Sequence, residues 1–322
     1  MSENNYSALP PGNGQSPRII FMGTPEFAVA SLDALVDAGY NIVGVITAPD
    51  RPAGRGMQLT ESAVKKYAKE KGLHILQPEK LKNPEFLAAL RSLQADLQVV
   101  VAFRMLPELV WNMPPMGTIN LHGSLLPQYR GAAPINWAVI NGEKETGVTT
   151  FKLQQDIDTG NILLQESFPI GDRDTAGDVH DRMKEIGAHL LVKTIRGLAN
   201  GDLTEKPQTG ISEAASLKHA PKIFTETGKI DWNKPVSDIY NLIRGLSPFP
   251  AAFTYLDGKL LKIYRSDIEI APPAIPPGEF KTDNKTFLKF AAPDGYIKLQ
   301  EIQLEGKKKM KTEDFLRGYK FN

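Results

Sequence analysis

The chain of 322 residues contains no cysteine. A disulfide framework, a thiolate metal site and a cysteine nucleophile are therefore excluded together. No apolar run approaches the roughly 18 residues that a membrane-spanning helix needs, so we expect no membrane partner. Charge of one sign is not in excess either, because 38 Lys and Arg nearly balance 37 Asp and Glu. Any binding of a polyanion must then come from a local basic patch.

Two nucleotide-binding motifs are also missing. The first strand-to-helix turn reads "GTPEFA" and has a single glycine where a dinucleotide-binding loop carries several, and no GxxxxGK[ST] sequence occurs. The five histidines show no metal-ligand spacing such as HExxH. We therefore expect neither a nucleotide cofactor nor a catalytic metal.

The N-terminus is polar and rich in proline and glycine, reading "MSENNYSALPPGNGQS". It has neither the basic region nor the apolar region of a signal peptide. We expect residues 1–16 to be a disordered leader, and the protein to be cytoplasmic.

Between residues 17 and 202, short apolar runs alternate with segments of helical periodicity. Runs such as "LQVVV" are typical of strands that are covered on both faces. The alternation predicts an α/β domain with a Rossmann-like, doubly wound and mostly parallel sheet. Strands are expected at 19–22, 41–47, 74–78, 95–103 and 117–122.

The pattern changes from residue 147 onward. A long amphipathic helix is predicted over 175–201, and the polar, proline-interrupted stretch 203–222 is expected to be a linker. From 223 to 322, short alternating segments are separated by turns, including an Asp-Gly hairpin signal at 257–258. This part is predicted to be a small β-barrel of the oligonucleotide-binding type.

A cluster of polar residues marks the stretch "INLHGSLLPQYRGAAPI" at 119–135. Asn120 and His122 stand two apart at a strand end, so their side chains point to the same face. An amide donor beside an imidazole donor suits stabilisation of an oxyanion in acyl transfer. The alternative is a capping Asn and a half-buried His, but the following turn with its lone Arg130 favours a functional site.

A carboxylate in the turn "DIDTGN" is the second candidate. Asp158 either closes an Asx-turn with its own backbone or reaches His122, where it would favour the charged imidazolium. Asp156 could play the same part, and spacing alone does not separate the two.

Residues 47–60, "TAPDRPAGRGMQLT", are expected to form a long mobile loop after the second strand. Arg51 and Arg55 could contact phosphates there. The alternative is a solvated connection without a binding role.

A second basic stretch, "GKKKMK" at 306–311, lies in the predicted barrel together with Lys259, Lys262 and Arg265. Lysine runs are usually solvated surface. On a barrel of the oligonucleotide-binding type, the same run would form a track for phosphates. The lysines concerned are Lys307, Lys308 and Lys309.

Several of these stretches together resemble the formyltransferases that use 10-formyltetrahydrofolate. They are "RIIFMGTPEFA", "PDRPAGRG", "NLHGSLLPQYRGAAPINWAVINGEKETGVT" and the "DTG" that contains Asp158. The resemblance covers nearly the whole folded chain and includes "GKIDWNKPVSDIYNLIRGLSPFPAAFTYLDG". Asn-x-His with a downstream Asp-Thr-Gly is shared by the whole family, whereas "PDRPAGRG" and the C-terminal domain resemble the branch whose acceptor is a charged tRNA.

The resemblance implies that the formyl group of 10-formyltetrahydrofolate passes to the α-amino group of methionine on initiator tRNA, for translation initiation. It implies that Asn120 and His122 stabilise the oxyanion. It also implies that Asp158 keeps His122 charged and helps proton transfer. It also implies folate contacts for Ser124, Leu125, Leu126, Pro127 and Phe103.

The tRNA is implied to bind through loop 49–57, which carries Arg51 and Arg55, and through the basic barrel with its three consecutive lysines. We expect this loop to be unordered before tRNA arrives, and the protein to be a monomer. Strand 95–103 continues into Arg104, where the family pattern leads us to expect a glycine.

Three other functions stay open. A sugar-nucleotide N-formyltransferase would share the donor and the Asn-His-Asp set, but it should lack "PDRPAGRG". A glycinamide-ribonucleotide formyltransferase would not need the last hundred or so residues. In a non-catalytic RNA-binding module, Asn120, His122 and Asp158 would occur by coincidence.

Overall fold

The structure is a computed structural model that describes residues 16–53, 58–208 and 217–321. The predicted leader up to residue 15, the predicted tRNA contact Arg55 and the middle of the predicted linker lie outside the described residues. Contacts between Cα atoms divide the chain into two compact units. The first comprises the described residues up to 130, 147–167 and 181–217. The second comprises those at 131–146, at 168–180 and from 218 onward.

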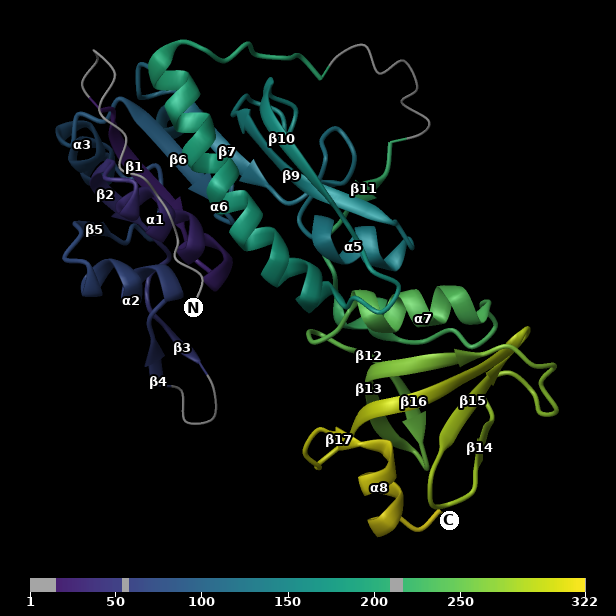
Figure 1. The fold of residues 1–322 in the computed structure, drawn as a ribbon. Coiled ribbons are helices and arrows are strands. Elements are labelled where there is room, and N and C mark those ends of the chain that lie inside the picture. Colours follow the sequence, from purple (N-terminus) through teal and green to yellow (C-terminus); the bar gives the residue numbers. More distant parts are fainter. Residues whose placement is uncertain (1–15, 54–57, 209–216, 322) are drawn as a thin grey trace. The chain divides into compact units, whose positions relative to one another are not determined.

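A seven-stranded sheet forms the centre of the first unit, in the order β10-β9-β7-β6-β1-β2-β5 (Figure 1). Strands β5, β2, β1, β6 and β7 are parallel, and β9 joins β7 antiparallel. The predicted α/β class with a mostly parallel sheet is therefore confirmed. The strands are β1 (Arg18–Gly23), β2 (Asn41–Ile46), β5 (Ile75–Leu76), β6 (Leu97–Val101), β7 (Thr118–His122), β9 (Glu145–Lys152) and β10 (Ile162–Pro169).

Helices cover both faces of this sheet. On one face, Ile20 and Met22 of β1 pack in one apolar cluster with Phe86 and Leu90 of α3. On the opposite face, α6 packs against β9, where the hydroxyls of Thr194 and Thr150 are 2.8 Å apart. Coverage on both faces explains why every residue of β6 is buried. The helices are α1 (Glu26–Asp37), α2 (Ala63–Glu70), α3 (Pro84–Ser92), α4 (Glu108–Trp111) and α6 (Ala176–Asn200).

The segment 47–60, which was expected to be a long mobile loop, contains two short strands. Strands β3 (Arg51–Ala53) and β4 (Gln58–Thr60) pair as a short antiparallel ribbon. Proline is tolerated on such an edge, so Pro52 does not exclude a strand there. The Asp50 carboxylate precedes the ribbon and accepts hydrogen bonds from Lys65 and Gln77.

The second unit contains a curled antiparallel sheet in the order β12-β13-β16-β15-β14, with β17 paired to β16. This sheet confirms the predicted class of the C-terminal part. Asp257 and Gly258 both have positive φ, at 48° and 76°, in the predicted two-residue hairpin. The strands are β12 (Ala252–Leu256), β13 (Lys259–Glu269), β14 (Phe280–Thr282), β15 (Leu288–Ala292), β16 (Gly295–Leu304) and β17 (Met310–Lys311). The other elements are β8 (Arg130–Gly131), α5 (Pro134–Ile140), β11 (His219–Ala220), η2 (Thr225–Gly228), α7 (Val236–Gly245) and α8 (Thr312–Gly318).

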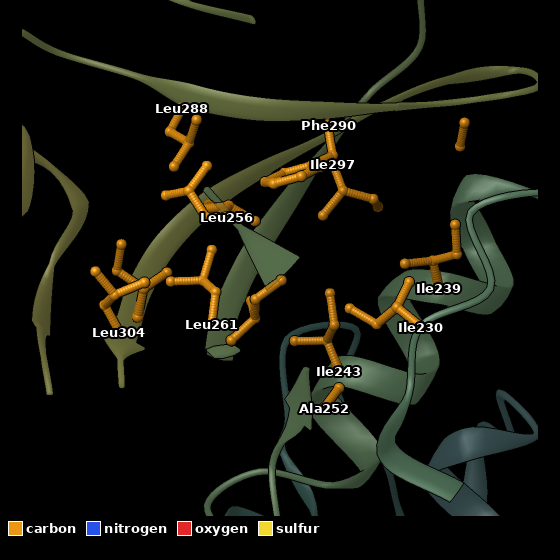
Figure 2. Close-up of a cluster of buried hydrophobic side chains, with 14 of the residues drawn as sticks. Ile230, Ile239, Ile243, Ala252, Leu256, Leu261, Leu288, Phe290, Ile297 and Leu304 are labelled. Carbon is orange, nitrogen blue, oxygen red and sulfur yellow. The ribbon is translucent and has the colours of Figure 1, made fainter. Parts of the chain in front are cut away.

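An apolar core fills the concave side of this sheet, where Ile239 and Ile243 of α7 point toward the strands (Figure 2). Phe290 lies in this core and is 1% exposed. Trp232 stacks on its ring with the centroids 4.8 Å apart. In the part of the chain that the structure describes, no helix has both the length and the apolar character needed to cross a bilayer.

We predict that Phe290→Ala lowers the free energy of unfolding of the second unit by about 3–5 kcal/mol, because a large buried side chain leaves a cavity. Urea denaturation followed by tryptophan fluorescence measures the change. Phe224→Ala is the matched control, since Phe224 is 59% exposed, and it should shift the free energy by less than about 0.5 kcal/mol. Equal losses in the two variants would contradict the assignment of Phe290 to the core.

Candidate functional site

At the carboxyl end of β7, His122 lies close to Asp158. His122 Nδ1 lies 3.7 Å from Asp158 Oδ2, and the two side chains are only 7% and 12% exposed. His122 is the last residue of β7, and Asp158 lies in the turn between β9 and β10. The antiparallel pairing of β9 with β7 returns that turn to the strand end. The predicted encounter of Asp158 with His122 is thus present in the structure.

The backbone fixes the tautomer of the His122 ring. Nε2 is 2.9 Å from the carbonyl oxygen of Tyr129, and this oxygen can only accept a hydrogen bond. Nε2 must therefore carry a proton and donate it to that carbonyl. Nδ1, which faces Asp158, is the ring position at which a proton can be gained or lost.

The turn also distinguishes Asp158 from Asp156. Asp158 adopts a positive φ of 54°, a conformation that Asp tolerates better than most residues, and its carboxylate is turned to His122. Asp156 is exposed. Gly160 keeps the turn tight, because a Cβ atom there would lie only 1.6 Å from the carbonyl oxygen of Lys152.

Asn120 lies on the same face of β7 as His122. It pairs in register with Val100 of β6, and paired residues of neighbouring strands point to one face. Val100 belongs to the apolar cluster against which Phe103 packs, so that cluster borders the amide. The Asn120 side chain is half-buried, and no group in residues 16–53, 58–208 or 217–321 forms a hydrogen bond with it. An amide, an imidazole and a carboxylate therefore border one strand end.

The turn after β7 is held by hydrogen bonds that use its backbone. The Thr149 hydroxyl donates to the carbonyl oxygen of Ser124 and accepts from the N–H of Leu126. Gln165 Nε2 donates to the carbonyl of Leu126 at 2.9 Å. The Ser124 hydroxyl is itself buried and donates to Gln128. Ser124 and Leu126 thus face inward, whereas Leu125 is half-buried.

Arg104 holds the segment that follows β6. Its guanidinium donates to the carbonyl oxygens of Glu79 and Pro78, and it lies over the Phe103 ring with 5.7 Å between Cζ and the centroid. Burial lowers the pKa of Arg104. Since Arg104 ties Phe103 to the segment after β5, it has a structural place that a glycine would not supply.

A glutamine that the sequence did not suggest links three segments of the site. Gln208 Nε2 donates to the carbonyl oxygens of Asp158 and Gly160, at 2.9 and 2.7 Å. Its Oε1 accepts from Arg130 Nη2 at 2.6 Å and from Nε at 3.2 Å. The side chain is 9% exposed, so Gln208 is a buried and fully used bridge between the Asp158 turn and Arg130.

The residues before Gln208 are also attached to this turn. Lys206 and Ile162 exchange two backbone hydrogen bonds, and Glu205 accepts from Asn161 at 2.9 Å. Glu205 also forms an ion pair with Lys152 at 2.5 Å, which keeps the pKa of the Glu205 carboxyl low. The prediction of a linker over 203–222 is therefore corrected at its start, because residues 205–208 dock onto the first unit.

The predicted basic residues lie elsewhere. Arg51 is exposed on β3. Lys307 and Lys308 are exposed in the turn between β16 and β17 of the second unit. Lys309, in the same turn, forms an ion pair with Glu301 at 2.9 Å. Among the described residues, no three His, Asp or Glu side chains gather as they would around a metal ion.

Two family models match the chain. Residues 17–195 match the formyl transferase model, and residues 222–320 match the C-terminal domain model of formyl transferases. The methionyl-tRNA formyltransferase of Bacteroides fragilis is 53% identical over 307 residues, covering 94% of this chain and 95% of the relative. That of Parabacteroides distasonis is 56% identical over 310 residues, covering 94% and 96%.

Solved structures share the fold at lower identity. WlaRD, a sugar 3N-formyl transferase crystallised with dTDP and 5-N-formyl-THF, is 22% identical with a TM-score of 0.65, covering 92% of this chain and all of that one. HypX from Aquifex aeolicus in complex with tetrahydrofolic acid is 17% identical with a TM-score of 0.62, covering 96% of this chain and 49% of that one.

We predict that Gln208→Leu loosens the Asp158 turn, because two carbonyls lose their donor and Arg130 loses its acceptor. Limited digestion with thermolysin measures this, since Ile157 in the turn is 57% exposed and offers a cleavage site. Losing a buried partner costs about 1–3 kcal/mol, so cleavage at Ile157 should become about 10- to 100-fold faster.

Gln300→Leu, which changes an exposed glutamine of the second unit, is the control and should leave this cleavage unchanged. If Gln208→Leu is cut at the wild-type rate, Gln208 does not hold the turn.

Proposed function

Since the chain belongs to the formyl transferase family, and within it to the methionyl-tRNA formyltransferases, we propose that it transfers the formyl group of 10-formyltetrahydrofolate to the α-amino group of methionine on initiator tRNA. It is a formyl-transfer enzyme, and the product would serve translation initiation in the cytoplasm. The observation that carries the proposed chemistry is the buried His122–Asp158 pair at the end of β7, beside the free amide of Asn120.

The formyl donor is proposed to bind at this edge of the sheet. Ligands of open α/β sheets lie outside the carboxyl ends of the strands, where β6 and β7 end together. Phe103 follows β6 and would offer an apolar surface to the pteridine ring. The turn of Ser124, Leu125, Leu126 and Pro127 would supply the other contacts. Two of the similar structures were solved with folates, which supports a folate at the same edge.

In the reaction, the methionine amine attacks the formyl carbon and forms a new C–N bond. The carbonyl oxygen then carries negative charge until the bond from the formyl carbon to N10 of the folate breaks. The Asn120 amide and the Nδ1–H of a protonated His122 are suited to donate to that oxygen. The Nδ1–Oδ2 distance of 3.7 Å exceeds a hydrogen bond, so the proton on Nδ1 is left for a ligand oxygen while Asp158 still favours the charge.

The proton balance involves the same pair. The attacking amine loses one proton, and N10 of the leaving folate gains one. Asp158 is proposed to help remove the first of these, because its carboxylate is the acceptor beside the imidazole. Nε2 stays on the Tyr129 carbonyl throughout, so the ring does not rotate between the steps.

We propose a division of labour along the chain. Residues 17–202 would carry the catalysis, and 223–322 would bind the tRNA of a monomeric enzyme. Exposed Arg51 on the ribbon and the exposed turn with Lys307 and Lys308 are the proposed phosphate contacts. Arg55 and Lys309 belong to the same proposal, and the folate and the initiator tRNA are the partners.

We predict that Asp158→Asn lowers kcat by about 10²–10⁴-fold, since an amide cannot support a charged imidazole or accept the proton. His122→Ala should lower it at least as much. Affinity for the folate, measured by fluorescence titration, should change little in both. Asp156→Asn is the matched control on the same turn and should retain wild-type kcat. A loss of folate affinity with normal kcat in Asp158→Asn would assign the residue to binding.

The acceptor is tested by supplying 10-formyltetrahydrofolate with methionyl initiator tRNA or with a panel of amino-sugar nucleotides. We expect formyl transfer to the tRNA alone, because the chain is over 50% identical to its tRNA-acting relatives and about 20% identical to the sugar-acting structures. Transfer only to a sugar nucleotide would support the proposed formyl-transfer chemistry but contradict the proposed tRNA acceptor.

A further inference from the structure

A hollow of about 440 Å³ lies entirely within the second unit, and the proposed formyl transfer makes no use of it. Residues from β13, β16 and α7 line it, together with residues at the junction of β17 and α8. Its volume is within the range of small-ligand sites. Five basic residues line it, which are Arg173, Arg244, Arg265, Lys298 and Lys311.

Arg244 is the deepest of these cations. It is 5% exposed, and burial lowers the pKa of its guanidinium. Its hydrogen bonds go only to neutral oxygens. Nε donates to Asn241 at 2.8 Å, and Nη1 donates to the carbonyls of Asp174 at 3.1 Å and Gly171 at 3.3 Å. Nη2 has no acceptor among the described residues. The carboxylates of Asp172 and Asp174 act on this guanidinium, but neither forms a hydrogen bond with it. One guanidinium donor of the lining therefore remains available to a bound anion.

The lining has three carboxylates, Asp267, Glu301 and Glu313, against five cations, so they neutralise only part of the positive charge. Arg265 pairs with Asp178, which lies outside the lining, at 3.6 Å. Asp267 is engaged by Arg173 at 3.4 Å and by Gln300 at 2.6 Å. Glu301 is engaged by Lys309, which lies outside the lining. Lys298 and Lys311 form no ion pair with any carboxylate in the described part of the chain. The lining therefore has a surplus of positive charge.

Two hydroxyl groups add unused hydrogen-bonding capacity. Ser266 and Thr312 both line the hollow and are 7% and 3% exposed. Neither hydroxyl oxygen has a hydrogen-bond partner among the described residues. Buried hydroxyls are normally paired, and rotation about χ1 would let them donate to a bound oxygen.

We propose that this hollow is a binding site for a phosphate group. A guanidinium that is held in place, two unpaired ammonium groups and two unused hydroxyls match the several acceptor oxygens and the charge of a phosphate. The phosphate could be part of an RNA backbone or of a small phosphorylated molecule, and both present the same chemistry. Only the RNA case rests on the function proposed above.

The first test measures binding of pyrophosphate to the full chain by isothermal titration calorimetry. The double variant Lys298→Gln, Lys311→Gln removes the two unpaired ammonium groups without touching the buried Arg244. We expect its affinity for pyrophosphate to fall at least about tenfold, because two charge-assisted hydrogen bonds are lost. Lys281→Gln changes an exposed lysine on β14 outside the lining, and it should bind like the wild type.

The second test measures binding of initiator tRNA to the same proteins over a range of salt concentrations. If the ligand is a backbone phosphate, the slope of log K against log salt should become shallower by about one in the double variant and stay unchanged in Lys281→Gln. Loss of pyrophosphate binding with an unchanged tRNA slope would identify a small phosphorylated ligand.

Unchanged binding of both probes in the double variant would overturn the proposal. Formyl transfer is assayed separately, so a failure of the proposed function would appear there and leave the pyrophosphate result intact.

Discussion

The parallel pairing of β7 with β6 is the constraint on which the site depends. In this register Val101 lies opposite Leu121, so both strands end at the same edge of the sheet and the loops that follow them start side by side. The pairing places Asn120 beside Val100, and Phe103 packs against the apolar cluster that contains Val100. The antiparallel addition of β9 then brings the Asp158 turn back to the same edge. A shift of β7 by one residue would turn Asn120 and His122 toward α6 and remove the site.

Local patterns were sufficient where neighbouring residues decide the structure. Apolar runs located the strands of the first sheet to within a few residues, and Asp257–Gly258 located the hairpin because this turn requires positive φ. The resemblance to formyltransferases is confirmed by the matching family models and relatives. The β3–β4 ribbon was missed because Pro52 and its neighbouring glycines were interpreted as breakers of regular structure.

Long-range contacts could not be predicted from the sequence. The spacing of Asp156 and Asp158 left either residue as the partner of His122, and only the backbone conformation of the turn decides between them. Gln208 gave no local signal, because it stands in a polar stretch and its partners are 48 to 78 residues away. The cations of the second unit likewise come from segments between Arg173 and Lys311 that only the fold brings together.

The position of Gln208 has a mechanical consequence. It is the last described residue before the gap at 209–216, and its amide donates to the two carbonyls that set the shape of the Asp158 turn. Any movement of Gln208 is therefore transmitted through its side chain to the turn that carries the carboxylate beside His122. A change in the conformation of residues 205–208 would thus alter the direction of the Asp158 carboxylate, although none of these residues touches His122.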